Sequence, residues 1–237
     1  MDYQKSLFVT MDLDGACDGV VRDTLDLIDR SGIPVTLFVT HATPLLERMR
    51  SDPLISLGIH PDFLPQLKGE TSVGFEQTLD DLLKIVPEAG MVHCHAGIDA
   101  EPILAACAAR GIKKDLNLFM PFSSGMDLKV FRHFTGVLRV PCFFNDKDYL
   151  AEETKFSAEE HICGTWGVKV FNFHPIHLFL NTENMERYQK IRPFEQDYDQ
   201  LKNFVNPDPE NGTRAFYNRI RDVSGKLGYE FKKLDEI

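Results

Sequence analysis

Acidic and imidazole side chains recur in this 237-residue sequence where apolar runs come to an end. Asp12 and Asp14 stand two residues apart in the segment VTMDLDGACD, so a regular strand would point both to the same face. Two carboxylates in one pocket cannot both stay ionised comfortably without a cation. A metal bound by one carboxylate, with the other as a base, would resolve the repulsion. The structural alternative is a turn or a cap for the next helix.

Histidines follow three later apolar runs. His60 in SLGIHPDFLP precedes a proline that favours extended backbone, and a neutral imidazole there can bind a divalent metal. His93 and His95 in GMVHCHAG are predicted to share one strand face, in a pattern familiar from metal hydrolases. His174 in VFNFHPIH suits a general acid, and His177 lies three residues further on. Each histidine has a structural alternative, a hydrogen bond to backbone at a strand end.

The elements that must position these side chains alternate between apolar strands and amphipathic helices. This order predicts an α/β fold, a distorted or incomplete (β/α)7 barrel of parallel strands with outer helices, over one domain spanning 1–237. An open doubly wound sheet is the alternative. In a parallel barrel the carboxyl ends of the strands meet at one mouth. The predicted strands are 6–12, 34–40, 54–60, 90–95, 114–120, 137–144 and 168–174, and the predicted helices are 20–31, 45–50, 75–86, 102–111 and 213–227.

Composition excludes some classes of partner and indicates the cellular compartment. The net charge of -10, without clustered Lys and Arg, argues against nucleic acid. No run reaches the ~20 apolar residues of a membrane helix, so membrane insertion is not expected. The sequence opens without an apolar signal core, and its five cysteines are scattered without a CxxC spacing. A cytoplasmic protein without a disulfide framework is therefore expected.

Together these motifs resemble the polysaccharide deacetylase superfamily, with its NodB-homology fold, over most of the chain. VTMDLD resembles the family's first motif, PVTLFVT the strand after it, and LGIHP the start of the metal-binding motif. FFNDKDY, which contains Asp146, falls near the fourth motif. FNFHP resembles the motif that supplies an acid histidine, and GKLGYEFKKLDEI resembles the usual family ending.

The resemblance implies a role for each of these motif residues. Asp12 would be the base, and His174 the acid that protonates the departing amine or alcohol. Asp146 would orient His174 or hold it charged. Asp14 and His60 would bind a divalent metal, expected to be zinc.

The third metal ligand departs from the family pattern. The family usually has a second histidine four residues after the first, but that position here is Leu64. His95 is therefore the expected ligand, with His93 and His177 as alternatives. His93 also stands where the family has a motif-three arginine. These departures are similar to those of the WbmS-like branch.

The implied function is a metal-dependent deacetylase that hydrolyses N- or O-acetyl groups on a sugar or polysaccharide precursor. One alternative is another metal-dependent barrel hydrolase, of amidohydrolase or phosphoesterase type, which a second metal at His93 or His177 would favour. A non-catalytic sugar-binding relative is the other. Phe63, Phe144 and Trp166 are candidates for stacking on a sugar, although core packing is the commoner role of such residues.

Overall fold

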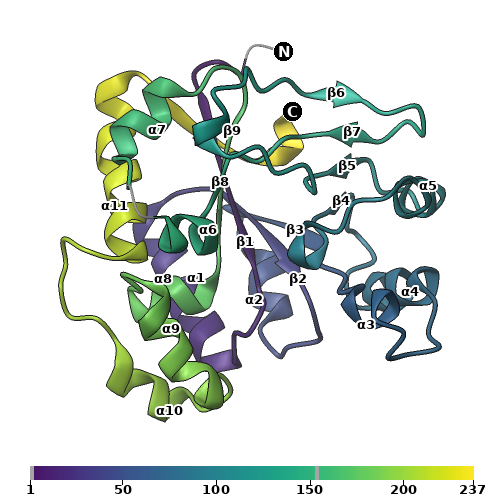
Figure 1. The fold of residues 1–237 in the computed structure, drawn as a ribbon, viewed down its shortest axis with the longest axis horizontal. Helices are drawn as coiled ribbons and strands as arrows, with labels where there is room; N and C mark the ends of the chain where they lie inside the picture. The colour runs from purple at the N-terminus through teal and green to yellow at the C-terminus, as the bar shows by residue number, and fades with distance from the viewer. Residues whose placement is uncertain (1–2, 153–154) are drawn as a thin grey trace.

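A single curled sheet organises the computed structural model, which describes residues 3–152 and 155–237 (Figure 1). The strand order is β6-β7-β5-β4-β3-β2-β1-β9-β8, and β10 pairs with the start of β1. Among the described strands only β6 and β7 pair antiparallel. The strands are β1 (Ser6–Asp12), β2 (Val35–Val39), β3 (Ile55–Ile59), β4 (Met91–Val92), β5 (Lys114–Asp115), β6 (Phe131–Arg132), β7 (Leu138–Arg139), β8 (Phe144–Asn145), β9 (Lys169–Phe173) and β10 (Glu230–Lys232).

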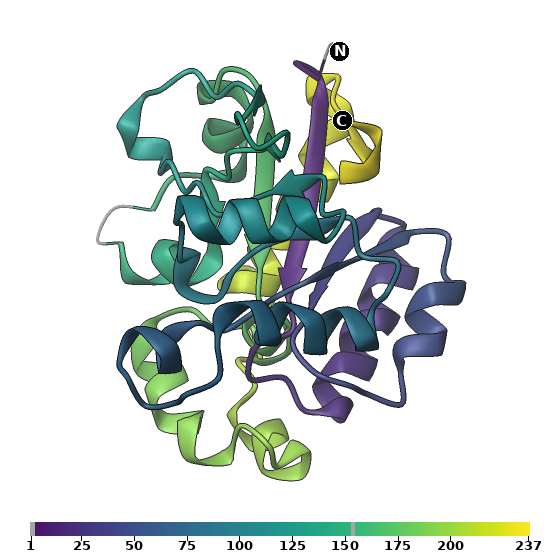
Figure 2. The same cartoon turned by 90° about the vertical axis from the view of Figure 1, so that its right-hand side faces the viewer.

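Helices cover the outside of this half-barrel. Helices α4 and α5 lie side by side over one part of the sheet (Figure 2), and α8 packs between α1 and α11. None of the described helices has both the length and the apolar character needed to span a membrane. The α-helices are α1 (Asp18–Ser31), α2 (Leu46–Ser51), α3 (Leu64–Leu67), α4 (Phe75–Ile85), α5 (Glu101–Ala109), α6 (Asp146–Ala151), α7 (Ala158–Gly164), α8 (Pro175–Leu180), α9 (Met185–Ile191), α10 (Tyr198–Leu201) and α11 (Thr213–Ser224).

Burial explains why the long strands form. Every residue of β1, β2, β3 and β9 is buried, as expected for parallel strands that are covered on both faces. Helix α1, which follows β1, is amphipathic, and it ends where Gly32 adopts a left-handed φ of 66° and donates its N–H to the Ile28 carbonyl. That conformation suits glycine and terminates the helix so that β2 can begin.

The predicted incomplete barrel of parallel strands is confirmed, but its later strands differ from the prediction. The expected strands 90–95 and 114–120 pair over only two residues each, as β4 and β5. The expected strand 137–144 is two strands, β7 and β8, on opposite sides of the sheet. Pro141 lies between them and has no N–H to donate to a ladder. The strands β6 and β10 were not predicted.

Candidate active site

The carboxyl ends of β1, β3, β4 and β9 meet at one edge of the sheet. Asp12 is the last residue of β1, His60 follows β3, His93 follows β4 and His174 follows β9. Because these strands are parallel and close in the sheet, residues far apart in sequence become neighbours. The structure therefore brings together the side chains that the sequence singled out.

Asp12 forms the buried floor of this group, with 1% of its surface exposed. Its Oδ1 accepts a hydrogen bond from His93 Nδ1 at 2.9 Å, and its Oδ2 accepts one from Asn172 Nδ2 at 2.8 Å. Burial acts to raise the pKa of Asp12, but the imidazoles of His93 and His60 outweigh it and hold that pKa well below its usual range. Asp12 is therefore a carboxylate at neutral pH.

Asn172 is a site residue that sequence reasoning missed. Its amide oxygen accepts a hydrogen bond from Thr10 Oγ1 at 2.7 Å, which turns the amide nitrogen toward Asp12. Strand alternation was the available signal, because it places Asn172 on the same face as His174, two residues later. The same alternation pairs Thr10 with Asp12 on β1.

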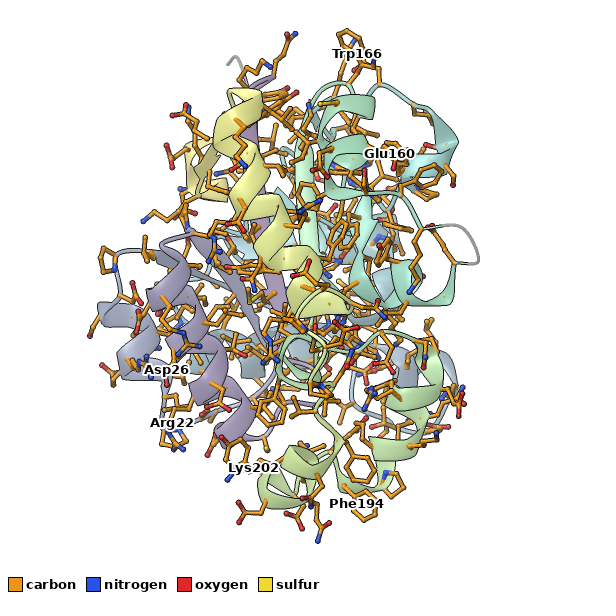
Figure 3. The ribbon with its side chains drawn as sticks, turned by 90° about the vertical axis from the view of Figure 1, so that its left-hand side faces the viewer. Arg22, Asp26, Glu160, Trp166, Phe194 and Lys202 are labelled. Carbon is orange, nitrogen blue, oxygen red and sulfur yellow. The ribbon has the colours of Figure 1, made fainter. Side chains whose placement is uncertain are left out.

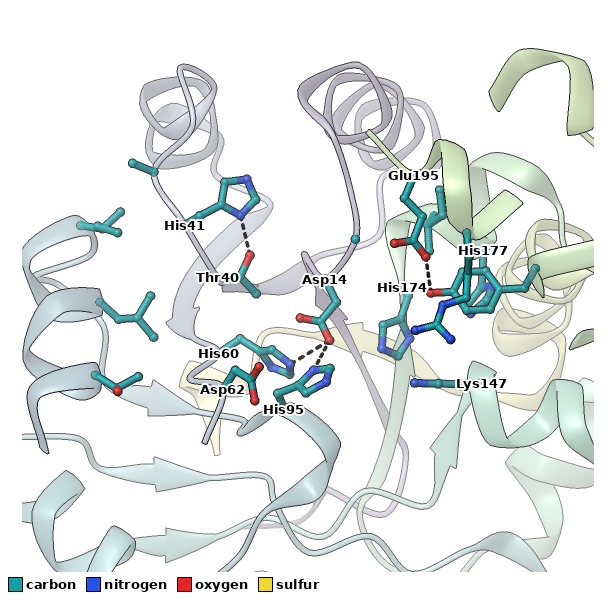
Figure 4. Close-up of a pocket in the computed structure, with 18 of the residues that line it drawn as sticks. Asp14, Thr40, His41, His60, Asp62, His95, Lys147, His174, His177 and Glu195 are labelled. Atoms are coloured by element: carbon teal, nitrogen blue, oxygen red, sulfur yellow. Dashed lines mark hydrogen bonds and ion pairs between the residues drawn. The ribbon is translucent and has the colours of Figure 1, made fainter. Parts of the chain in front are cut away.

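Asp14 lies beyond the end of β1, in a turn where Gly15 has a φ of 63°. The expectation that strand alternation would align it with Asp12 was wrong, because the strand has already ended. Its Oδ2 instead lies 3.2 Å from His60 Nε2 and 2.5 Å from His95 Nδ1 (Figure 4). Burial acts to raise the pKa of Asp14, but hydrogen bonds from His60 and His95 hold it well below its usual range.

His60 stands between the two carboxylates. Its Nε2 faces Asp14, while its Nδ1 lies 3.4 Å from Asp12 Oδ1. That Nδ1 atom is buried and has no hydrogen-bond partner among the described residues. One imidazole therefore contacts both acidic groups, which are held on different sides of its ring.

His93 and His95 do not share a strand face, contrary to the prediction. The strand β4 ends at Val92, and His95 opens a short 3₁₀ turn (His95–Gly97) in which Ala96 has a φ of 57°. His93 contacts Asp12, whereas His95 contacts Asp14. Each histidine of the pattern thus serves a different carboxylate.

Three groups of described residues bring potential ligand atoms within 4.8 Å of one another. Asp12 and Asp146 are buried. Both carboxylate oxygens of each residue already accept hydrogen bonds, and none of the donors is His60 or His95, the histidines that contact Asp14. Asp14 is partly exposed and accepts only from two histidines that could themselves be ligands. One carboxylate and two imidazoles form a donor set that suits zinc. The groups are Asp12–His60–His93, Asp14–His60–His95 and Asp146–His174–His177.

His174 and Asp146 form a tight buried pair. Asp146 Oδ1 lies 2.7 Å from His174 Nδ1, and Oδ2 accepts the His174 backbone N–H at 2.8 Å. Burial acts to lower the pKa of His174, but the charge and hydrogen bond of Asp146 outweigh it and raise that pKa to about 9. His177 lies next to them, and its Nδ1 faces Thr182 Oγ1 at 3.2 Å. Burial lowers the pKa of His177 to about 4.

A cavity of about 710 Å³ opens over this group. A second hollow of about 460 Å³ is lined by Asp12 and His93, among others. Asp14, His60, His95 and His174 line both, so the polar group lies where the two meet. Sequence reasoning missed much of the outer wall, which comes from loops and helices without a strand-end pattern. Those residues include Asp62, Asp81, Lys147, Tyr188, Arg192 and Glu195.

The three aromatic candidates do not line either hollow. Phe63 and Phe144 are core residues, with 1% and 3% of their surfaces exposed. Trp166 is 73% exposed, but it precedes β9 and so lies at the amino ends of the strands. Figure 3 shows Trp166 at the opposite end of the molecule from Phe194. Phe194 directly precedes Glu195, which lines the cavity. Sugar stacking by these three residues is therefore not supported.

Solved structures resemble this chain to different degrees. A protein from Bordetella bronchiseptica, assigned as a polysaccharide deacetylase involved in O-antigen biosynthesis (wbms), is 33% identical. The match covers 93% of this chain and 91% of that one, with a TM-score of 0.85. The Bc1960 peptidoglycan N-acetylglucosamine deacetylase is 11% identical, with a TM-score of 0.52 over 98% of this chain and 87% of that one. This second likeness shows the fold alone.

The same fold also serves other chemistry. A 4-alpha-glucanotransferase from Thermococcus litoralis has a TM-score of 0.52 at 12% identity, covering 98% of this chain and 39% of that one. A comparison with curated proteins finds no match. The family described as WbmS-like polysaccharide deacetylase matches residues 9–192, which is most of the sequence. This chain belongs to the WbmS-like polysaccharide deacetylase family.

Proposed function

We propose that this family member is a metal-dependent hydrolase that removes an acetyl group from a sugar or polysaccharide precursor. Family membership supports carbohydrate deacetylation. The observation that carries metal dependence is the group Asp14, His60 and His95 at the cavity floor. We propose zinc as the ion, and when bound it would polarise the acetyl carbonyl and acidify a water molecule.

Asp12 is the proposed base. It is ionised, and it contacts the ring of His60 on the side away from Asp14. Hydrogen bonds from His93 and Asn172 fix the plane of its carboxylate, which has further lone pairs with which to accept a proton. We propose that Asp12 takes the proton of the attacking water, with His93 and Asn172 as positioning residues.

His174 is the proposed acid. Its pKa of about 9 keeps it protonated at neutral pH, as an acid that protonates a leaving group must be. Its Nδ1 is held by Asp146, and its Nε2 lies 3.8 Å from Asp12 Oδ2. The proposed proton acceptor and proton donor thus face each other, so one reacting acetyl group can lie within reach of both.

Acetate release tests the proposal. Protein purified without affinity histidines would be assayed for bound metal by mass spectrometry and for acetate release from acetylated sugars and sugar nucleotides. Chelated protein should lose activity and regain it with zinc. Full activity in metal-free protein would contradict metal dependence. Hydrolysis of phosphate esters alone would place the protein in the phosphoesterase class.

The roles of base and acid can be separated from metal binding. Asp12→Asn and His174→Asn should each lower activity by about 10²–10⁴-fold while metal content stays near that of the native protein. His133→Asn is a matched control, because His133 lies in the β6–β7 hairpin, outside both hollows. Loss of metal in Asp12→Asn would instead make Asp12 a ligand.

A further inference from the structure

Two cationic side chains on the cavity wall are not held in an ion pair by any residue that the structure describes. Lys147 follows Asp146 in α6, and Arg192 follows the end of α9. Both residues are exposed. Within residues 3–152 and 155–237, neither side chain makes a hydrogen bond or an ion pair. In a chain with a net charge of -10, two unpaired cations in one cavity stand out against the general charge.

The outer carboxylates of the same wall are already occupied. Glu195 Oε1 accepts a hydrogen bond from the Tyr188 hydroxyl at 2.8 Å, and Asp81 pairs with Lys84 at 2.6 Å. Asp62 Oδ1 accepts the backbone N–H of Leu64, the first residue of α3. These carboxylates stay anionic, because a hydrogen bond from a neutral donor does not cancel their charge. What the wall offers a ligand beyond them is two cations, Lys147 and Arg192, that no described carboxylate holds in an ion pair, and the natural complement of such a cation is an anion.

Lys147 is the better placed of the two cations. Together with the proposed metal ligands and His174 it lines both hollows, whereas Arg192 lines only the larger one. Figure 4 shows the end of its side chain directed toward the space beside His174 and His95. An anion that reached Lys147 would belong to the same sugar unit as the reacting acetyl group, or to its immediate substituent.

We infer that Lys147 is a substrate-binding residue for an anionic group, so the substrate class is an acidic acetylated sugar. This inference rests on the proposed deacetylase function. Two sources share the required chemistry, the carboxylate of an acetamido-hexuronic acid and the phosphate of an acetamido-sugar phosphate. A hydrogen bond between an ammonium and either anion is stronger than one between neutral groups, so a neutral sugar would leave this contact unused.

A binding experiment tests this without requiring turnover. Titration calorimetry would compare N-acetylglucosamine with its 1-phosphate and with the corresponding uronic acid. The native protein should bind at least one acidic sugar about 10- to 100-fold more tightly than the neutral sugar, and Lys147→Met should abolish that difference. Lys190→Met is the matched control, because Lys190 pairs with Glu186 on α9 and does not line the cavity. Equal affinity of the native protein for all three sugars, or no binding, would overturn the inference.

Acetate release from the same three sugars provides the second arm. Lys147→Met should lower kcat/KM by about 10- to 100-fold on the acidic substrate and by less than about 2-fold on the neutral one. An equal loss on both would make Lys147 a residue of the general machinery and contradict the inference. If no sugar releases acetate but the binding preference persists and needs Lys147, deacetylation fails while the anion site stands. A preference for the phosphate or for the uronic acid identifies the source.

Discussion

Two pairs of carboxylates in this molecule, each with one buried member, are neutralised in different ways. In the first, Arg139 bonds to Asp115 at 2.7 Å and to Asp99 at 2.8 Å, and Asp115 is completely buried. In the second, the ionisable partners of Asp12 and Asp14 among the described residues are imidazoles, chiefly His60 between them. Arginine stays charged at all relevant pH values, whereas an imidazole can release its proton.

This difference separates a permanently charged group from the proposed metal-binding one. The guanidinium of Arg139 closes its group permanently, because its donors match the two carboxylates. The histidines of the second group can give up their protons and offer nitrogen lone pairs to a metal beside a carboxylate. Asp14 and His60 of the second group line the 710 Å³ cavity, whereas Arg139, Asp115 and Asp99 do not. Carboxylates that are neutralised by protons, and can exchange those protons for a metal ion beside a cavity, are what a metal hydrolase needs.

The largest expected effect follows from a substitution in the second group, that of Asp12, Asp14 and their histidines. His60→Asn should remove bound metal and lower acetate release by about 10³-fold or more, because the several kcal/mol supplied by a Lewis acid are lost. Metal analysis by mass spectrometry, together with acetate release, measures both effects. Retention of stoichiometric metal would contradict the ligand assignment of His60, and His133→Asn should match the native protein in both assays.

A substitution in the first group, that of Arg139, Asp115 and Asp99, should lower the stability of the fold and leave the bound metal content unchanged. Arg139→Met leaves Asp115 buried without its cation, so the free energy of unfolding should fall by about 3–5 kcal/mol in a denaturant titration. The folded protein should still bind metal. The control Lys190→Met removes an exposed pair with Glu186 and should cost about 0.5 kcal/mol or less. Loss of metal from folded Arg139→Met would show that the two groups are coupled.

The smallest effect concerns the pH at which the acid works. The pKa of His174, about 9, places the alkaline limb of the rate profile near pH 9. Asp146→Asn removes the main interaction that opposes burial, so the limb should move toward the ordinary value near 6.5, with about a 30-fold loss at pH 8 and less at pH 6. Asp148→Asn is the graded comparison, because the charge of Asp148, on the same helix, acts on His174 without a hydrogen bond between these two described side chains, so the limb should move less than in Asp146→Asn. An unchanged limb in Asp146→Asn would contradict the role of Asp146.

The same pair has a consequence for stability. Because folding raises the pKa of His174 above its unfolded value, the stabilisation is complete below about pH 6.5 and is lost as the pH rises through about 9. The free energy of unfolding contributed by this pair should therefore decline across that window. Asp146→Asn should flatten this part of the stability curve, which denaturant titrations at several pH values would measure.

The sequence by itself determined the ends of the long strands and the residues placed there. Asp12, His60 and His174 could be found because buried parallel strands are continuous apolar runs, and a polar residue at the end of such a run is conspicuous. The incomplete barrel followed from the same runs. Alternation within a strand would also have shown Asn172, since strand periodicity is a local property.

Only the tertiary structure decided which side chains meet. The contacts of His93 with Asp12 and of His95 with Asp14 depend on a strand that ends at Val92 and on the turn that follows it. The position of Lys147 depends on β8, which pairs across the sheet with β9. Turns, short strands and pairings across a sheet are set by contacts between segments distant in sequence, and local periodicity carries no record of those contacts.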